Sequence, residues 1–345
     1  MHTQTLIIGG GLSGLSLAYR LQQADHDYHL LDARRRLGGR IKSLIVGDVA
    51  VDLGPSWIWP GQERIAALLP ELGLHAFEQH AQGTQLYEQA SGEVMQNAGF
   101  MSMAGALRIG GGTSALTDAL AARLDPSRMT MNAQAAHISD APSATLADGR
   151  TITADRIVLA LPPRVAADLT YAPVLPQIAT LKSIPTWMGA HAKFVAVYGT
   201  PFWRDAGLSG DASSRRGPMV EIHDASPEDG TFGALFGFVG LPAHVRAQVG
   251  DQVQHAALTQ LTNIFGAAAS KPLTSHLEDW SAAAFTSTAA DATPPTGHPP
   301  YQMPAPLSRV WNDKLIFTST EMAPDNGGLI EGALAAAEHT ARKIL

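Results

Sequence analysis

The sequence contains no cysteine, and this absence excludes several kinds of chemistry. Disulfide bonds, thiolate metal ligands, a cysteine nucleophile and a flavin attached through sulfur all need a thiol. We expect no metal site in this chain. Any redox chemistry must therefore come from a bound cofactor.

Charged residues are also scarce, at 16% of the chain. The 31 Asp and Glu exceed the 24 Lys and Arg, the formal net charge is −7, and the basic residues are scattered. Because nucleic acids are bound by clustered basic residues, we expect no nucleic-acid partner. The first residues, MHTQTLIIGGGLSG, contain no cationic leader, and no apolar run of ~20 residues follows the C-terminal helix pattern. These features predict a cytoplasmic protein with no membrane partner.

The order of the hydrophobic patterns predicts an α/β fold. Residues 3–8 have the pattern of a buried strand, residues 12–23 that of a helix, and YHLLD that of a second strand, which together make one βαβ unit. Residues 171–285 are richer in Trp and Phe and alternate in polarity, which predicts a separate antiparallel sheet with helices. One more strand, KLIFTST, precedes an amphipathic helix at the end of the chain.

A glycine-rich turn joins the first strand to the first helix. Gly9, Gly11 and Gly14 form G-x-G-x-x-G, in which the glycines allow a tight turn, close approach to a pyrophosphate, and close packing of helix on strand. Asp32 closes the next strand, where a carboxylate can accept hydrogen bonds from an adenosine ribose. The pattern predicts a dinucleotide site, and a nicotinamide-binding domain would share it. Ordinary turn glycines and a solvated Asp32 are the alternative.

The segment at the end of the second strand, DARRRLGGR, distinguishes a nicotinamide site from another kind of dinucleotide site. It resembles the E-A-x-x-R-x-G-G-R segment of the flavin-containing monoamine oxidase family, with Asp32 in place of the usual glutamate. In that family the loop packs along the diphosphate and ribose of FAD, so arginines offset the phosphate charge and glycines allow the backbone to come close. An exposed basic turn would explain Arg34 and Arg35 equally well.

Further segments resemble the same family in the same order. They are DLGPSWIWPGQER, RIGGGTSAL, ADRIVLALPP, HAKFVAVYGTPFWRDAGLSG, DW at 279–280, and FTSTEMAPDNGGLIEGA. The resemblance implies an α/β protein with a Rossmann-like FAD-binding domain, similar to those of glutathione reductase and p-hydroxybenzoate hydroxylase, and a smaller antiparallel-sheet α+β substrate domain. The implied FAD-binding domain comprises residues 1–78, 108–172 and 286–345, and the implied substrate domain comprises residues 79–107 and 173–285.

The resemblance also implies the site residues. The residues expected to bind FAD are Gly9, Gly11, Leu12, Ser13, Gly14, Asp32, Ala33, Arg34, Gly38, Gly39, Arg40, Gly54, Pro55, Ser56, Trp57, Ala135, Trp280, Ser319, Thr320, Glu321, Gly328 and Leu329. Lys193, Trp280 and Leu329 are expected to take part in catalysis.

Lys193 lies in an otherwise apolar strand pattern, AKFVAVY, where an unpaired ammonium would be costly. The family's lysine at this position holds a water molecule against the reactive nitrogen of the flavin. The alternative is a lysine that extends its head to solvent. His191 and Trp59 are interpreted more simply, as a hydrogen-bonded histidine and a core tryptophan.

Some residues depart from the family's pattern. Ser319 replaces the glycine of G-T-E, and Leu329 replaces a tyrosine that forms half of the family's aromatic cage. The segment at residues 79–107 is much shorter than the family's helical insert. A different pocket, more open or built for an unusual substrate, is expected.

The predicted function is oxidation of an amine at its carbon–nitrogen bond, by hydride transfer to FAD and hydrolysis of the imine product. Dioxygen or another acceptor would then reoxidise the flavin, and a homodimer is left open. One alternative is a renalase-like oxidase of aberrant dihydronicotinamides, which has a similar length and the same cofactor fold. The other is a flavin-binding protein that serves a partner enzyme.

The lack of cysteine leads to a first prediction. Acid precipitation of the purified yellow protein should release all of its FAD into the supernatant, because no thiol is present to hold the flavin covalently. Absorbance of supernatant and pellet measures this, and flavin that stays with the pellet would show another covalent link.

Overall fold

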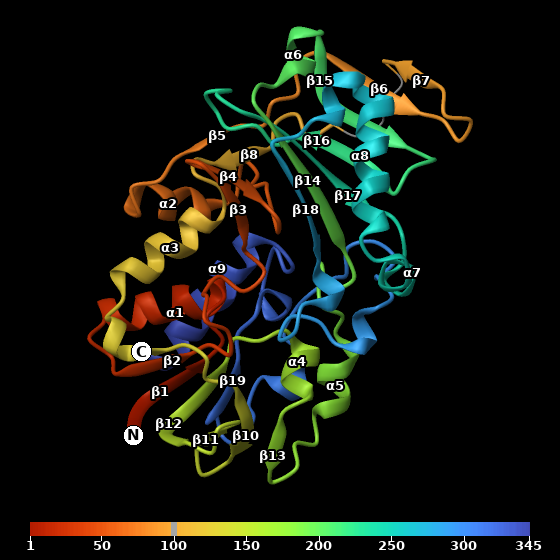
Figure 1. Cartoon of the computed structure of the whole chain (residues 1–345). Coiled ribbons are helices and arrows are strands. Elements are labelled where there is room, and N and C mark those ends of the chain that lie inside the picture. The colour runs from red at the N-terminus through yellow and green to blue at the C-terminus, as the bar shows by residue number, and fades with distance from the viewer. Residues whose placement is uncertain (98–101) are drawn as a thin grey trace.

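The computed structural model describes residues 1–97 and 102–345 (Figure 1). Within these residues the chain forms an 8-stranded sheet, here called the first sheet, and a 7-stranded sheet, here called the second sheet. Both termini lie beside the first sheet (Figure 1). Residues 98–101, which belong to the segment expected in the substrate domain, lie outside the described residues.

The first sheet has β1 at its centre, paired in parallel with β2 on one side and β12 on the other. Leu6 and Ile7 of β1 are fully buried, as expected for a strand covered on both faces. The strands of this sheet are β1 (His2–Ile8), β2 (Tyr28–Leu31), β9 (Met129–Thr130), β10 (Ala135–Ser139), β11 (Ser143–Leu146), β12 (Thr151–Leu159), β13 (Thr170–Ala172) and β19 (Leu315–Phe317). The predicted βαβ unit is confirmed, and so is the α/β fold.

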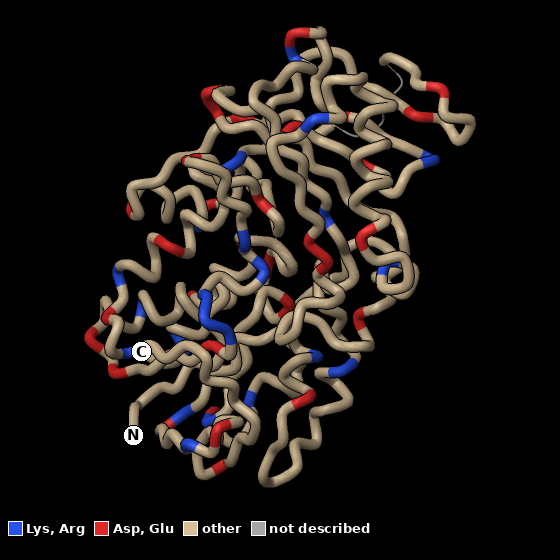
Figure 2. The backbone as a smooth tube through the Cα atoms, viewed as in Figure 1, with Lys and Arg blue, Asp and Glu red and all other residues tan. Residues whose placement is uncertain are grey.

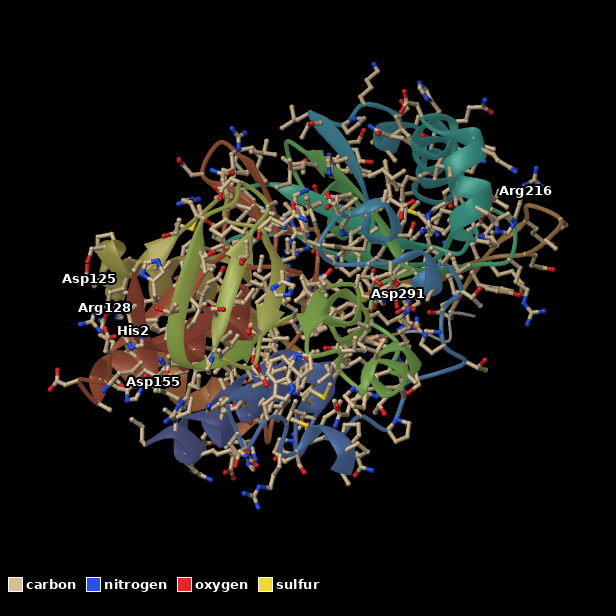
Figure 3. All side chains as sticks on the ribbon, turned by 90° about the horizontal axis from the view of Figure 1, so that it is seen from below. His2, Asp125, Arg128, Asp155, Arg216 and Asp291 are labelled. Carbon is tan, nitrogen blue, oxygen red and sulfur yellow. The ribbon has the colours of Figure 1, made fainter. Side chains whose placement is uncertain are left out.

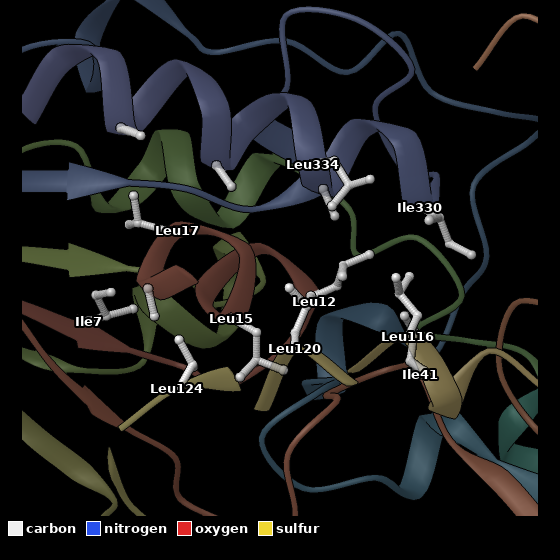
Figure 4. Packing of buried hydrophobic residues seen from close by; sticks show 14 of the residues in the cluster. Ile7, Leu12, Leu15, Leu17, Ile41, Leu116, Leu120, Leu124, Ile330 and Leu334 are labelled. Carbon is white, nitrogen blue, oxygen red and sulfur yellow. The ribbon is translucent and has the colours of Figure 1, made fainter. Parts of the chain in front are cut away.

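Helices α1 (Leu12–Gln23), α3 (Ser114–Arg123) and α9 (Ile330–Ile344) pack together beside the first sheet. Figure 4 shows leucines of α1 and α3 facing Ile330 and Leu334 of α9. A fully buried leucine such as Leu15 stabilises the fold by about 1.5–3 kcal/mol. This packing fixes the N-terminal ends of α1 and α9. The remaining α-helices of the described residues are α2 (Glu63–Glu71), α4 (Pro163–Ala167), α5 (Ile178–Ser183), α6 (Phe202–Asp205), α7 (Ala243–Val249) and α8 (Gln252–Phe265).

The second sheet has the order β18-β14-β17-β16-β15-β6-β7. It is antiparallel except that β6 runs parallel to β15, which the sequence did not predict. Its strands are β6 (Thr84–Glu88), β7 (Val94–Gln96), β14 (Ala192–Tyr198), β15 (Leu208–Ser214), β16 (Met219–Asp224), β17 (Gly233–Val239) and β18 (Thr274–Asp279). Two small pairs, β3 (Ser43–Val46) with β4 (Val49–Asp52) and β5 (Ala76–Glu78) with β8 (Leu107–Ile109), complete the strands of the described residues. The division of the chain into two domains at the predicted boundaries stays a prediction.

Successive side chains of β14 point alternately to the two faces of the second sheet. Phe194 and Ala196 pack with residues of α8, whereas Val195 and Val197 pack with Val51 of β4. Because successive side chains of a strand point to opposite faces, Lys193 lies on the same side as Val195. Its head group is therefore directed away from α8 and toward the chain that follows β4.

Residues of both charge signs are interspersed along the backbone (Figure 2). Viewed from below, His2 and Asp155 lie at one end of the molecule and Arg216 lies at the opposite end (Figure 3). Among the described residues, no helix combines the length and the apolarity needed to cross a membrane.

Candidate active site

A cavity of about 700 Å³ lies where the first and second sheets meet. Of the expected site residues, those that line it are Gly9, Gly11, Leu12, Ser13, Asp32, Arg34, Gly38, Gly39, Arg40, Gly54, Pro55, Ser56, Trp57, Ser319, Thr320, Gly328 and Leu329. Residues of β16 and β17 line the other end. The cavity therefore joins the glycine turn at residues 9–14 to the second sheet.

The three glycines of the turn serve different purposes. A Cβ atom on Gly9 would lie 2.5 Å from the carbonyl oxygen of Ala160, and the φ angle of Gly9 is +112°. A Cβ atom on Gly14 would lie 1.9 Å from the carbonyl oxygen of Gly9. At Gly11, in contrast, only the Cα atom of Gly39 lies within reach, at 3.8 Å. Packing thus requires Gly9 and Gly14, whereas Gly11 leaves an open space on the cavity side.

The N-terminus of α1 also opens on this cavity. Gly11 caps the helix without a side-chain hydrogen bond, and the first turn contains no acidic residue. The first N–H groups of a helix have no partner within it and carry a partial positive charge. Gly11, Leu12 and Ser13 line the cavity, so this end suits a diphosphate.

The backbone holds the Asp32 carboxylate at the end of β2. Its Oδ2 atom accepts a hydrogen bond of 2.8 Å from the N–H of Gly10, and its Oδ1 atom accepts one of 2.7 Å from the N–H of Arg34. The Asp32 residue is buried but still lines the cavity, where a ribose hydroxyl could reach it.

Arg34 is not part of an exposed turn, so that interpretation is wrong for this residue. Its guanidinium donates to the carbonyl of Ala284 and to Oγ1 of Thr286, at 2.7 Å from the latter. Burial lowers the pKa of Arg34. Arg35 is exposed, as the simple turn predicts.

Arg40 faces the cavity and is neutralised by a buried acid. Its guanidinium donates to both carboxylate oxygens of Glu321, at 2.6 and 3.1 Å, and to the carbonyl of Trp187. The Glu321 side chain is fully buried and does not line the cavity. This bidentate pair fixes the end of the 38–40 turn against the segment before α9.

Lys193 is fully buried, which excludes the interpretation that its head reaches solvent. The Nζ atom donates to Oγ of Ser56 at 2.6 Å and to the carbonyl of Gly54 at 3.1 Å, and lies 3.8 Å from the ring centre of Phe236. Burial lowers the pKa of Lys193 to about 7, although the Asp52 carboxylate acts in the opposite direction. Lys193 does not line the cavity itself but holds two residues that do.

Several other expected site residues also lie outside the lining. Trp280 is buried behind the cavity wall and donates from Nε1 to the carbonyl of Leu53 at 3.0 Å. Ala135, the first residue of β10, is buried in a hydrophobic core cluster. Gly14 and Ala33 complete this group, with Glu321 and Lys193 as described above.

The sequence did not identify several residues of the lining. Trp59 lines the cavity and is 38% exposed, so its interpretation as core is wrong. Other lining residues that were not expected include Trp187, His191, Glu221, Phe238, Arg246 and Phe285. His191 was interpreted as hydrogen-bonded, but no described residue bonds its buried Nδ1 atom. No local motif marks these side chains, because they meet only when the second sheet packs on the first.

The residues of the cavity fit a polar ligand of dinucleotide type. The Oγ atom of Ser319 is buried in the lining and has no hydrogen-bond partner among the described residues. Buried polar atoms without a partner are rare in native proteins and point to a bound group. The glycine turn, the helix N-terminus and Asp32 therefore define a dinucleotide-binding protein of the Rossmann type.

Comparisons with known proteins name the family. Residues 7–72 match the model of an NAD(P)-binding Rossmann-like domain, and residues 79–345 match that of flavin-containing amine oxidoreductases. The chain belongs to the flavin-containing amine oxidoreductase family. The predictions of an FAD cofactor and of a flavin-dependent amine oxidase are thereby confirmed.

Relatives match nearly the whole chain at low identity. A putative flavin-containing monoamine oxidase of Mycobacterium tuberculosis is 24% identical over 443 aligned positions, which cover 98% of this chain and 96% of the relative. Since this chain has 345 residues, the relative carries segments that the chain lacks. A putrescine oxidase of Kocuria rosea is 22% identical, with coverage of 83% of this chain and 84% of the relative.

Solved structures share the fold. A putrescine oxidase with bound putrescine superposes with a TM-score of 0.83 at 19% identity, covering 100% of this chain and 99% of the other. The cyclohexylamine oxidase of Brevibacterium oxydans gives a TM-score of 0.82 at 20% identity, covering 99% and 98%.

The open space at Gly11 leads to a second prediction. The Gly11→Val variant should fold normally but bind FAD at least about tenfold more weakly, because the side chain would occupy space next to the helix N-terminus and remove hydrogen bonds worth about 0.5–1.5 kcal/mol each. Flavin stoichiometry and circular dichroism of the apoprotein measure the two effects.

Gly199→Val is the matched control, because Gly199 has open space around it and lies outside the cavity. Full FAD content in a folded Gly11→Val variant would contradict the assignment.

Proposed function

We propose that this enzyme oxidises a small amine at the end of the cavity that the second sheet provides, and that dioxygen is the electron acceptor. The observation that carries this is the continuity of one cavity, from the glycine turn to a wall that includes Trp57, Phe238 and Leu329. FAD held at the glycine turn and Asp32 would supply a hydride acceptor for the carbon next to the amine nitrogen and an electron donor for dioxygen. The imine product then hydrolyses to a carbonyl compound and ammonia or an amine.

The apolar wall would hold the amine in a dry environment. Trp57 packs edge-on against the ring of His223 and contacts Phe236, so its own ring is held in one position. Leu329, the N-cap residue of α9, adds an aliphatic surface where the family has a tyrosine. Exclusion of water by such side chains strengthens the electrostatic interactions inside the site.

Lys193 would act through the loop at residues 54–57. Its Nζ atom holds Ser56 and Gly54, which both line the cavity, so its charge lies just behind the wall. A positive charge at this position would stabilise negative charge that develops in the cavity during electron transfer to dioxygen. A homodimer and a cytoplasmic location stay predictions.

The low pKa of Lys193 gives a third prediction. The Lys193→Met variant should keep its FAD, but reoxidise by dioxygen about tenfold more slowly at pH 6, because one fixed positive charge and donor is lost. With a folded-state pKa of about 7, Lys193 is mostly protonated at pH 6 and mostly neutral at pH 8. The difference in reoxidation rate between variant and parent should therefore become smaller as the pH rises from 6 to 8. Stopped-flow mixing of reduced enzyme with oxygenated buffer measures it, and equal rates for variant and parent at pH 6 would remove Lys193 from the mechanism.

Anaerobic bleaching tests the function itself, as a fourth prediction. Primary and secondary amines should bleach the oxidised flavin absorbance, and air should restore it with release of hydrogen peroxide. Dihydronicotinamides and their isomers form the comparison set for the renalase-like alternative. Bleaching by dihydronicotinamides alone would overturn the proposal.

A further inference from the structure

Three neighbouring strands of the second sheet place Lys193, Phe238 and Glu221 in one row. Lys193 on β14 is the cross-strand partner of Phe238 on β17, and Phe238 is the partner of Glu221 on β16. Neighbouring strands are about 4.8 Å apart, so Glu221 lies about 10 Å along the sheet from Lys193. Both Phe238 and Glu221 line the cavity. The row therefore runs from the 54–57 loop along the cavity wall to a carboxylate.

One oxygen of this carboxylate is free to bind a ligand. The Oε1 atom of Glu221 is 2.6 Å from Nε2 of His223, and no described residue hydrogen-bonds Oε2. The only other carboxylate in the lining, within the described part of the chain, is Asp32, which accepts two backbone hydrogen bonds at the opposite end. Glu221 thus provides negative charge at the second-sheet end of the cavity.

A buried histidine holds Glu221 in place. His223 is fully buried, and its Nδ1 atom is 2.8 Å from Oδ1 of Asp211, which is also fully buried. Burial alone would lower the pKa of His223, but the hydrogen bonds to Asp211 and Glu221 outweigh it and raise the pKa. Both ring nitrogens then donate, as an imidazolium requires. Glu221 is the member of this group that faces the cavity, and its carboxylate is the charge that a ligand would meet there.

No arginine of the lining neutralises this charge. Arg40 pairs with Glu321, and Arg246 pairs with Asp279 at 2.7 Å. Arg34 donates to the segment at residues 284–286. Among the described residues, the only salt-bridge partner of Glu221 is His223. A partly buried carboxylate of this kind favours a cation supplied by a ligand.

We propose that Glu221 binds a second cationic group of the substrate, so that the enzyme prefers linear diamines or polyamines to monoamines of the same length. His223 and Asp211 are positioning residues that hold the Glu221 carboxylate toward the cavity. This inference rests on the proposed oxidation of amines and names the substrate class. The substrate lies with one amino group near the 54–57 loop and its distal ammonium at Oε2 of Glu221.

Pairs of matched substrates test this proposal as a fifth prediction. Each linear diamine is compared with the monoamine in which a methyl group replaces the second ammonium, using the FAD-loaded enzyme. The diamine should have a kcat/KM at least about tenfold higher, as expected for a charge-assisted hydrogen bond in a partly buried site. Glu221→Gln should bring the ratio of the diamine kcat/KM to the monoamine kcat/KM to within about twofold of one, because the amide keeps the size but loses the charge.

Two variants complete the design. Glu93→Gln is the control, because it makes the same charge change on an exposed residue outside the cavity. His223→Asn should lower the ratio of the diamine kcat/KM to the monoamine kcat/KM, whereas a general loss of folding would lower both values alike and leave their ratio unchanged.

Binding without turnover separates this proposal from the function. Calorimetric titration of dithionite-reduced enzyme, which cannot oxidise the amine, should show tighter binding of the diamine than of the monoamine and loss of the difference in Glu221→Gln. If no amine bleaches the flavin but this difference is present, the proposed function fails and the role of Glu221 stands. An equal affinity for diamine and monoamine in the parent enzyme, or an unchanged preference in Glu221→Gln, would overturn the role of Glu221.

Discussion

Close approach of backbone segments at the end of β1 is the constraint on which the site depends. Gly9 and Gly14 leave no room for side chains, so α1 starts directly against the strand and points its N-terminus at the cavity. Gly11 forms a backbone bridge to Gly38, which stacks the second glycine turn on the first. These two glycine-rich turns thus leave one polar cleft at the carboxyl end of the parallel strands. Ligands of such sheets bind at this end.

Buried charges connect the second sheet to this cleft. Lys193 can remain in an apolar strand because Ser56 and Gly54 satisfy its head group, and Lys42 pairs with Glu278 at 2.5 Å. An unpaired ion in such surroundings would cost several kcal/mol. These contacts can form only when the second sheet lies in one position relative to the 54–57 loop. The same interactions that allow the burial of charge therefore hold the 54–57 loop, which lines the cavity, against the second sheet.

The two ends of the cavity differ in chemical character. The N-terminus of α1 makes the glycine-turn end suited to anions, whereas Glu221 makes the second-sheet end suited to cations. The diphosphate of a flavin dinucleotide lies between its riboflavin and adenosine halves, and a protonated amine substrate carries positive charge. Anionic and cationic groups are thereby favoured at opposite ends of one cavity. Between the two ends, Leu329 makes one side of the cavity wall aliphatic.

The sequence by itself determined the local elements and the dinucleotide end of the site. The strand at His2–Ile8, the helix at Leu12–Gln23 and the glycine turn between them follow from hydrophobic period and from the backbone freedom of glycine, which are properties of neighbouring residues. Tertiary structure alone decided that Trp59 lines the cavity, that Lys193 lies behind its wall, and that Glu221 reaches it with His223 and Asp211 behind. Those positions depend on which strands of the second sheet become neighbours and which face is covered, and contacts between residues far apart in the chain leave no local pattern in the sequence.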